Sequence, residues 1–302
     1  MERLRRRLGA IGAHLVPAAH HAPAAAVNVS ERRLDHRNVH AAIRTVLAAG
    51  GANERVQQVV ADHLIDANLR GHDSHGIQMV SKYMKAVKQG TLAPNAPGRV
   101  LKDTRSVLVI DGGQDTAGGY GQVIALDAMQ RAIQKTSEHG ICALAIRAVH
   151  HIGRTGTYTE LAARYGYVAM CFVNVAGHAA SVAPFGGADK RLGTNPMAVA
   201  VPMPAAHLDG PISLDFATSI VAGGKVGVKA NRKEPMEKGV LIDEDGEPTI
   251  DPIPFAKQRQ GSILPFGLHK GGGIQLICEL LGGALSGGWT ADDSPLDRPA
   301  AI

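Results

Sequence analysis

The sequence is organised around the stretch Arg70-Gly71-His72-Asp73-Ser74-His75-Gly76, which directly follows a helical pattern. It places two histidines, an aspartate and a hydroxyl between glycines. A hydroxyl beside an imidazole can pass or orient a proton, and glycine lets the backbone approach a ligand closely. A helix end that runs into a polar loop is the alternative, because histidine and glycine are both common there. Alone, the stretch fits either interpretation.

The residues before this stretch predict helices. Apolar side chains recur at helical spacing over 39–47 and again over 56–64, and a third helical pattern around Tyr83 ends at Gly90. Ser30 or Asn38 is expected to cap the first helix, and Asn53 the second.

The residues after it alternate between short apolar runs and helical segments. This alternation predicts an α/β fold. The continuous runs at 141–146 and 168–175 are typical of strands buried on both faces. The expected strands are 107–113 with its turn, 141–146, 168–175, 197–201, 212–216 and 241–248 with a hairpin-like turn. The expected helices are 125–137, 157–165 and 274–285.

Composition indicates a globular protein that does not bind nucleic acid. Of the 302 residues, 45% are hydrophobic and 20% are charged. The formal net charge is +5, but the first seven residues alone carry +3, and no basic stripe follows. The electrostatic footprint of a nucleic-acid-binding protein is therefore missing.

The cysteines indicate a reducing compartment, and a cytoplasmic protein is expected. Cys142, Cys171 and Cys278 are isolated, which fits a reducing compartment. No apolar run is long enough to span a bilayer, so no membrane partner is expected. No metal is expected either, since His72 and His75 lack a third ligand at suitable spacing. Residues 1–30 are rich in Arg, Ala and His and are interpreted as a disordered extension.

A second polar cluster begins with His150 and His151 and continues through Ile152, Gly153 and Arg154. It directly follows the expected strand 141–146, and ligands of open α/β sheets bind beyond the carboxyl ends of strands. A histidine pair there is a candidate acid or base, although solvated loop histidines are also common.

Three further clusters carry possible chemistry. The segments 184–187 and 191–196 are rich in backbone donors and could bind an anion or dinucleotide, or could simply form turns. Asp215 follows an apolar run and could orient a histidine or cap a helix. The segment 269–273, at a helix start, suits a phosphate. No G-x-G-x-x-G, P-loop, G-x-S-x-G or H-E-x-x-H motif is present.

Taken in order, these motifs resemble those of the malate/L-lactate dehydrogenase family of the non-Rossmann type. That family includes ureidoglycolate, sulfolactate and diketogulonate enzymes and the cyclic-imine reductases. The matching segments are Asn68 to Gly76, Gly119 to Gln122, His151 to Gly153, Pro184 to Gly187, Leu192 to Pro196, Asp215 to Ser219 and His269 to Gly271.

The resemblance implies a non-Rossmann nicotinamide-binding fold with a mixed sheet. It implies a helical, dimerisation part built from residues 31–105 and 265–302, and a nicotinamide-binding α/β part at 106–264. It further implies a homodimer that transfers hydride reversibly between NAD or NADP and a small 2-hydroxy acid or its 2-oxo form.

Site residues follow from the same resemblance. His151 matches the proton acceptor for the substrate hydroxyl, and Ser74, His75 and Asp215 match a proton relay of the imine-reductase branch. Lys82 or Arg154 is expected to hold the substrate carboxylate, because Met79 occupies a position where some members carry arginine. The residues expected to line the dinucleotide are Ile152, Gly153, Thr194, Asn195, Pro196, Lys225, His269, Lys270 and Gly271.

Two alternatives stay open at this point. The same motifs suit an NADPH-dependent reductase of cyclic ketimines. The chain also ends soon after Gly288, where relatives continue, which suits a truncated and catalytically silent homologue.

Overall fold

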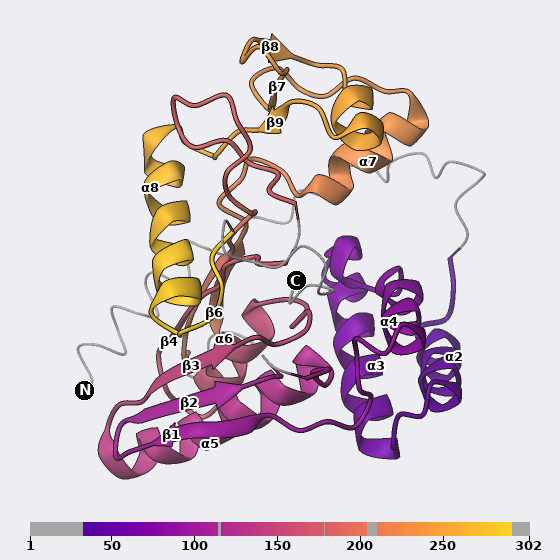
Figure 1. Cartoon of the computed structure of the whole chain (residues 1–302). Coiled ribbons are helices and arrows are strands. Elements are labelled where there is room, and N and C mark those ends of the chain that lie inside the picture. Colours follow the sequence, from indigo (N-terminus) through magenta and orange to yellow (C-terminus); the bar gives the residue numbers. More distant parts are fainter. Residues whose placement is uncertain (1–32, 114–115, 178, 204–209, 292–302) are drawn as a thin grey trace.

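A computed structural model describes residues 33–113, 116–177, 179–203 and 210–291 (Figure 1). The expected extension at 1–30 and the candidate cap Ser30 lie outside these residues. No helix within the described ranges is long and apolar enough to cross a membrane.

Three helices form one layer of the protein, seen together on one side of Figure 1. They are α2 (His36–Ala49), α3 (Glu54–Leu69) and α4 (Met79–Lys88). Their apolar faces share a core that includes Leu47, Val60, Leu64 and Tyr83, each with no exposed surface. The side chain of Asn53 caps α3 as predicted, whereas the cap of α2 is Asp35 and not Asn38. The Asp35 carboxylate accepts the amides of residues 37 and 38, so Asn38 already lies in the first turn.

A mixed sheet follows this helical layer. Strands β1 (Arg99–Asp103) and β2 (Val107–Asp111) pair antiparallel, and β2 pairs parallel with β3 (Ala143–Arg147). Helix α5 (Gly121–His139) makes the crossover between β2 and β3. Its buried Ile124 and Ala128 pack on Leu108 and Ile110 of β2.

A second sheet consists of three antiparallel strands, β4 (Ala169–Phe172), β5 (Met197–Val201) and β6 (Ile212–Phe216). Helix α6 (Gly156–Arg164) packs against all three strands. Together with the mixed sheet, this arrangement confirms the predicted α/β class.

A small third sheet has the order β8 (Pro248–Thr249), β7 (Leu241–Ile242), β9 (Ser262–Ile263). It shares a core with α7 (Gly223–Arg232). The chain then enters α8 (His269–Cys278), which continues as a π-helix, η3 (Glu279–Ala284). Two other short helices are the 3₁₀ turn η1 (Asp73–His75) and the π-helix η2 (Pro254–Gln258).

Three sequence predictions need correction. The runs at 141–146 and 168–175 contain the shorter strands β3 and β4, and neither is buried on both faces: Ala143 and Met170 are exposed and the other strand residues are only partly buried. The last helix begins at His269, so its glycines occupy the first turn and do not precede the helix. A continuous apolar run does not distinguish a strand buried on both faces from one whose second face is open. The division into two parts stays a prediction.

Two glycines test how backbone conformation sets stability. Gly140 ends α5 in the left-handed region, at φ 83°, whereas Gly227 lies inside α7 with open space around its α-carbon. Gly140→Ala is expected to lower the free energy of unfolding by about 1 kcal/mol, because a β-carbon is strained at that φ. Gly227→Ala is expected to raise it by roughly 0.5–1 kcal/mol. Urea unfolding of both variants measures the sign of each change in the free energy of unfolding. A Gly140→Ala variant more stable than the wild type would contradict the left-handed conformation of Gly140.

Candidate active site

His151 lies at the centre of the candidate site, in the loop that follows β3. Its side chain is buried, and its Nδ1 lies 2.6 Å from the hydroxyl of Tyr83 on α4. The amide of Gln122, in the first turn of α5, lies 2.6 Å from the same hydroxyl. Three separate elements therefore meet in one buried hydrogen-bonded chain.

The predicted pair Ser74 and His75 joins this cluster directly. Ser74 Oγ lies 2.9 Å from His75 Nδ1, and the His75 ring stacks on the ring of His151 with centroids 5.3 Å apart. The structure thus brings together the histidines of two motifs that are 76 residues apart in the sequence.

Asn68 holds the loop that carries this pair. Its amide donates to Asp73, and its carbonyl oxygen accepts the backbone amide of Ile77. A β-carbon at Gly76 would lie 2.1 Å from Asn68 Oδ1, so glycine is required there. The opening motif therefore contains both a site pair and the residues that fix its loop.

Burial keeps both histidines of the stack neutral. It lowers the pKa of His151 well below its ordinary value, and the electrostatic influence of the neighbouring His75, His150, His63 and Lys82 lowers it further. The pKa of His75 is also lowered, first by burial and then by His72, although Asp215 opposes this. A neutral imidazole can accept a proton.

His63, on α3, fixes the loop that carries His151. Its Nε2 accepts the backbone amide of Arg154 at 2.8 Å. Gly153 adopts φ 75°, and a β-carbon there would lie 2.1 Å from the same nitrogen. The glycine and the histidine therefore fit each other, and the loop is locked to the helical layer.

Arg154 has a different role from the one predicted. Its guanidinium is buried and binds the carboxylate of Glu160 through two hydrogen bonds of 2.9 and 2.7 Å. Asp66 and Asp215 lie 3.4 and 3.6 Å away. Because protein carboxylates already surround its planar fork, we assign Arg154 to the scaffold and not to the substrate.

Asp215, on β6, supports the same scaffold. Its carboxylate accepts the backbone amide of Gly156 at 2.8 Å. No hydrogen bond joins it to His75 within the described ranges, although its charge raises the pKa of His75. Asp215 therefore acts on the histidine pair at longer range than a direct relay.

Lys82 is the lysine whose charge acts on both histidines. It is exposed on α4, next to Tyr83, and its charge lowers the pKa of both His75 and His151. An exposed ammonium near a buried proton acceptor is suited to an anionic substrate group.

Two of the segments predicted to bind a dinucleotide, 184–187 and 269–271, meet at the start of α8. The rings of Phe185 and His269 are in contact, with centroids 5.9 Å apart. Lys270 is exposed beside His269. Gly271 is buried, and a β-carbon there would lie 1.9 Å from the carbonyl oxygen of Phe266. The carbonyl oxygen of Thr194 accepts both the amide and the hydroxyl of Thr218, at 2.9 Å each.

Asn195 is structural in this cluster. Its side chain is fully buried and donates to Glu279 at 2.7 Å and to the carbonyl of Gln275 at 3.2 Å. It therefore fastens the loop before β5 to α8, and its amide is occupied by protein. The carbonyl oxygens of Ile152 and Pro196 also accept bonds from protein, from Tyr158 and from residue 173 respectively.

Lys225 lies near the opening motif. It is exposed in the first turn of α7, and a β-carbon on the preceding Gly224 would lie 3.6 Å from that of Ser74. The start of α7 is therefore adjacent to the Ser74–His75 pair.

Sequence reasoning missed Tyr83, Gln122, His63 and Glu279. Tyr83 and His63 look like ordinary members of apolar helix faces, and Gln122 belongs to the matching segment Gly119 to Gln122 but has no assigned role there. Only their positions in the folded chain relate them to His151 and Asn195.

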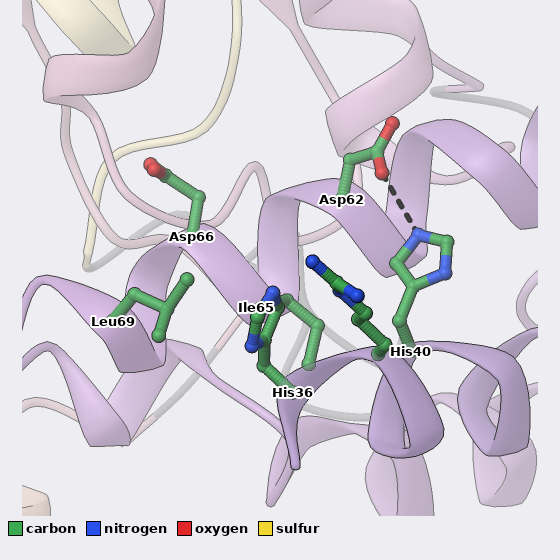
Figure 2. Close-up of a pocket in the computed structure, with 7 residues that line it drawn as sticks. His36, His40, Asp62, Ile65, Asp66 and Leu69 are labelled. Carbon is green, nitrogen blue, oxygen red and sulfur yellow. Dashed lines mark hydrogen bonds and ion pairs between the residues drawn. The ribbon is translucent and has the colours of Figure 1, made fainter.

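A pocket of about 340 Å³ lies between α2 and α3, away from these residues (Figure 2). Figure 2 shows the His40 ring next to the Asp62 carboxylate, and His40 Nε2 lies 2.8 Å from Asp62 Oδ1. No predicted site residue lines the pocket. Within the described part of the chain, no group of three or more His, Cys, Asp or Glu is placed to hold a metal ion.

Comparison with known proteins agrees with this arrangement. The sequence profile described as malate/L-lactate dehydrogenase matches residues 34–300. Hydroxycarboxylate dehydrogenase B of Escherichia coli O157:H7 is 42% identical over 274 residues, covering 90% of this chain and 74% of the relative.

Two solved structures share the fold. The sulfolactate dehydrogenase of Methanocaldococcus jannaschii superposes with a TM-score of 0.75 at 35% identity, over 88% of this chain and 74% of its own. The Δ1-piperideine-2-carboxylate reductase of Pseudomonas syringae pvar. tomato superposes with a TM-score of 0.77 at 28% identity, over 89% of this chain and 77% of its own.

The fold and the histidine-centred site thus define an α/β oxidoreductase of the hydroxy-acid dehydrogenase class. The chain belongs to the malate/L-lactate dehydrogenase family.

The buried His63 predicts a dependence of stability on pH. Burial lowers its pKa from 6.5 to about 4, so the unfolded chain takes up this proton before the folded one as pH falls. Its contribution is fully present above about pH 6.5 and is lost towards pH 4, a change of up to about 3 kcal/mol.

His63→Gln keeps an acceptor for the Arg154 amide and removes the titration. Urea unfolding between pH 7 and pH 4.5 should therefore show a shallower slope in this variant, by roughly one proton. An unchanged slope would contradict the burial of a neutral His63.

Proposed function

We propose that the chain is an NAD- or NADP-dependent dehydrogenase of a small 2-hydroxy acid, with His151 as the proton acceptor. One observation carries the proposal: a buried, neutral imidazole is hydrogen-bonded to Tyr83 and stacked on His75. Such a group is suited to general base catalysis, and a buried base surrounded by histidines has few structural explanations.

The chemistry follows from the site. Oxidation of a 2-hydroxy acid removes a hydride from carbon and a proton from the hydroxyl. A bound nicotinamide supplies the hydride chemistry. His151 takes the hydroxyl proton, and the stacked His75 with its Ser74 partner offers a route by which protons exchange with solvent. In the reverse direction, the same imidazole returns the proton to the oxygen.

Lys82 is the residue proposed to bind the substrate carboxylate. It is exposed and its charge faces both histidines, whereas Arg154 is occupied by Glu160. A lysine binds a carboxylate as a point charge and not as a bidentate fork. Substrates with one compact carboxylate next to the reacting carbon are therefore expected.

The residues around the starts of α7 and α8 fit the phosphates of a dinucleotide. Neither helix has a capping side chain, and each carries an exposed lysine in its first turn, Lys225 or Lys270. Free amides at a helix start and a nearby cation favour an anion. The remainder of the proposed dinucleotide site is lined by Ile152, Gly153, Thr194, Pro196, His269 and Gly271. Asn195 supports the loop before β5.

Homodimer formation and a cytoplasmic location belong to the same proposal. Cys142, Cys171 and Cys278 are all free, which suits a reducing compartment.

The second candidate function is reduction of a cyclic imino acid with NADPH, favoured by the likeness to the piperideine-2-carboxylate reductase. Its carboxylate and ring nitrogen would meet the same Lys82 and histidine pair.

Replacement of His151 tests the proposed base. His151→Gln keeps a hydrogen-bonding side chain but cannot accept a proton, so kcat for 2-hydroxy-acid oxidation should fall by roughly 10²–10⁴-fold. The measurement is nicotinamide absorbance with malate, lactate, sulfolactate and Δ1-piperideine-2-carboxylate and either cofactor.

His36→Gln, an exposed histidine at the start of α2, is the matched control and should keep full activity. Unchanged turnover in His151→Gln would remove His151 from the mechanism. A folded wild-type protein without turnover on any substrate would favour the silent homologue.

The depressed pKa of His151 also predicts a pH profile. The neutral form persists below the ordinary value of 6.5, so kcat/KM for oxidation should stay level down to about pH 6.5 and fall only at lower pH. A fall that begins above pH 7 would contradict this assignment.

Lys82→Met should raise KM for the acid by roughly tenfold or more with a smaller change in kcat, because a charge-assisted contact to the carboxylate is lost. Lys85→Met, another exposed lysine on α4, is the control and should leave KM unchanged. Equal effects of the two substitutions would argue against a specific contact.

A further inference from the structure

Gln122 is buried beside the proposed base and has no other assigned role. It is 1% exposed, Tyr83 is 0% exposed, and His151 is 4% exposed, so this chain of side chains is shielded from water. The Tyr83 oxygen lies 2.6 Å from both the Gln122 amide and His151 Nδ1. Whatever determines the direction of these two hydrogen bonds also determines where the proton of His151 sits.

Two directions are possible. If the Gln122 NH₂ donates to the Tyr83 oxygen, the Tyr83 O–H is directed at His151 Nδ1, and the single proton of a neutral imidazole must sit on Nε2. If the amide is turned by 180°, Gln122 Oε1 accepts the Tyr83 O–H, and the Tyr83 oxygen accepts Nδ1–H from His151. The nitrogen and oxygen of an amide are told apart by such networks.

The proposed chemistry selects the second direction. A base that takes the substrate proton needs a bare Nε2, so its own proton must sit on Nδ1 and be donated to the Tyr83 oxygen. The Tyr83 O–H then needs an acceptor. Within the described ranges, the polar groups within hydrogen-bond distance of the Tyr83 oxygen are those of His151 and Gln122. Gln122 Oε1 is therefore the acceptor that remains.

We propose that Gln122 is a positioning residue that accepts the Tyr83 hydroxyl proton and thereby holds the proton of His151 on Nδ1. The inference rests on the proposed role of His151 as the base. When His151 takes up the substrate proton, both ring nitrogens carry hydrogen, and the Nδ1–H···Tyr83 bond is already in place. Tyr83 and Gln122 contact neither substrate nor cofactor in this scheme and act only through His151.

Among the described residues, the groups that shift the pKa of His151 include no carboxylate. The charged or titratable groups that act on it are His75 from η1, His150 from its own loop, His63 from α3 and Lys82 from α4. In the Ser-His-Asp triads a carboxylate fixes the tautomer of the base, and a wrong tautomer there is severely damaging. A neutral Tyr–Gln pair would do the same work here without a buried negative charge.

Two variants of Gln122 separate this role from simple packing. Gln122→Glu has the same shape and can accept the Tyr83 O–H, so it should keep kcat within about tenfold of wild type, with its pH profile moved to higher pH by the added negative charge. Gln122→Met keeps similar volume but cannot accept, so Tyr83 turns its O–H to Nδ1. Its kcat for oxidation should fall roughly 10²-fold with little change in KM.

The tautomer itself is measured by two-bond ¹H–¹⁵N correlations in protein labelled at histidine nitrogen, without substrate. The signals of His151 are assigned by their loss in His151→Gln. Wild type and Gln122→Glu should show the proton on Nδ1, and Gln122→Met should show it on Nε2. Circular dichroism and thermal unfolding confirm that each variant is folded, and if Gln122→Met does not fold, Tyr83→Phe replaces it.

The outcomes are distinct. A wild-type proton on Nε2, or an unchanged tautomer in both Gln122→Met and Tyr83→Phe, would overturn the assignment of Gln122. An Nδ1 tautomer in a protein that turns over no 2-hydroxy acid would support the role of Gln122 and overturn the proposed function. Equal losses of activity in the Glu and Met variants would indicate packing alone and contradict the proposal.

Discussion

The contact between His151 and Tyr83 is the interaction on which the candidate site depends. It joins the loop after β3 to helix α4, and so connects the mixed sheet to the helical layer. Tyr83 and His151 are both almost fully buried, so water does not compete for this contact. His63 on α3 fixes the same loop from the other side through the backbone amide of Arg154. The geometry of the base is therefore a consequence of how two layers pack.

Charge placement follows from the same burial. The ionisable side chains near the site fall into two groups. The histidines are neutral, and Arg154 and Glu160 are charged and paired with each other. The histidines stay neutral because the interior disfavours their charged form, and Lys82 opposes protonation further. Arg154 stays charged because Glu160 binds it in two bonds, and burial of either partner alone would be costly. Lys82 is an exposed ammonium whose charge acts on both histidines.

The extent to which the sequence predicted the site can be judged from particular residues. The pair Ser74 and His75 and the histidine His151 come together as their motifs indicated, because glycine-flanked polar runs at element ends carry a local signal. Arg154 was expected to face substrate and instead lies inside a carboxylate cage. Asn195 was expected near a cofactor and instead fastens a loop to α8. In both cases the local pattern was that of a loop, and the partner that fixes the side chain, Glu160 or Glu279, lies outside the motifs in the sequence.

The sequence by itself determined the α/β class, most of the helices and strands, the glycine-bounded motifs and the family. These depend on periodicity, turn residues and ordered motifs, which are properties of short segments. Only the tertiary structure decided which polar side chains are buried, which are paired, and which face a substrate. Tyr83 looks like a core residue in the sequence and becomes the partner of His151 because α4 crosses the loop after β3. Hydrogen-bond partners and pKa values depend on distances between elements, and no short segment of sequence contains those distances.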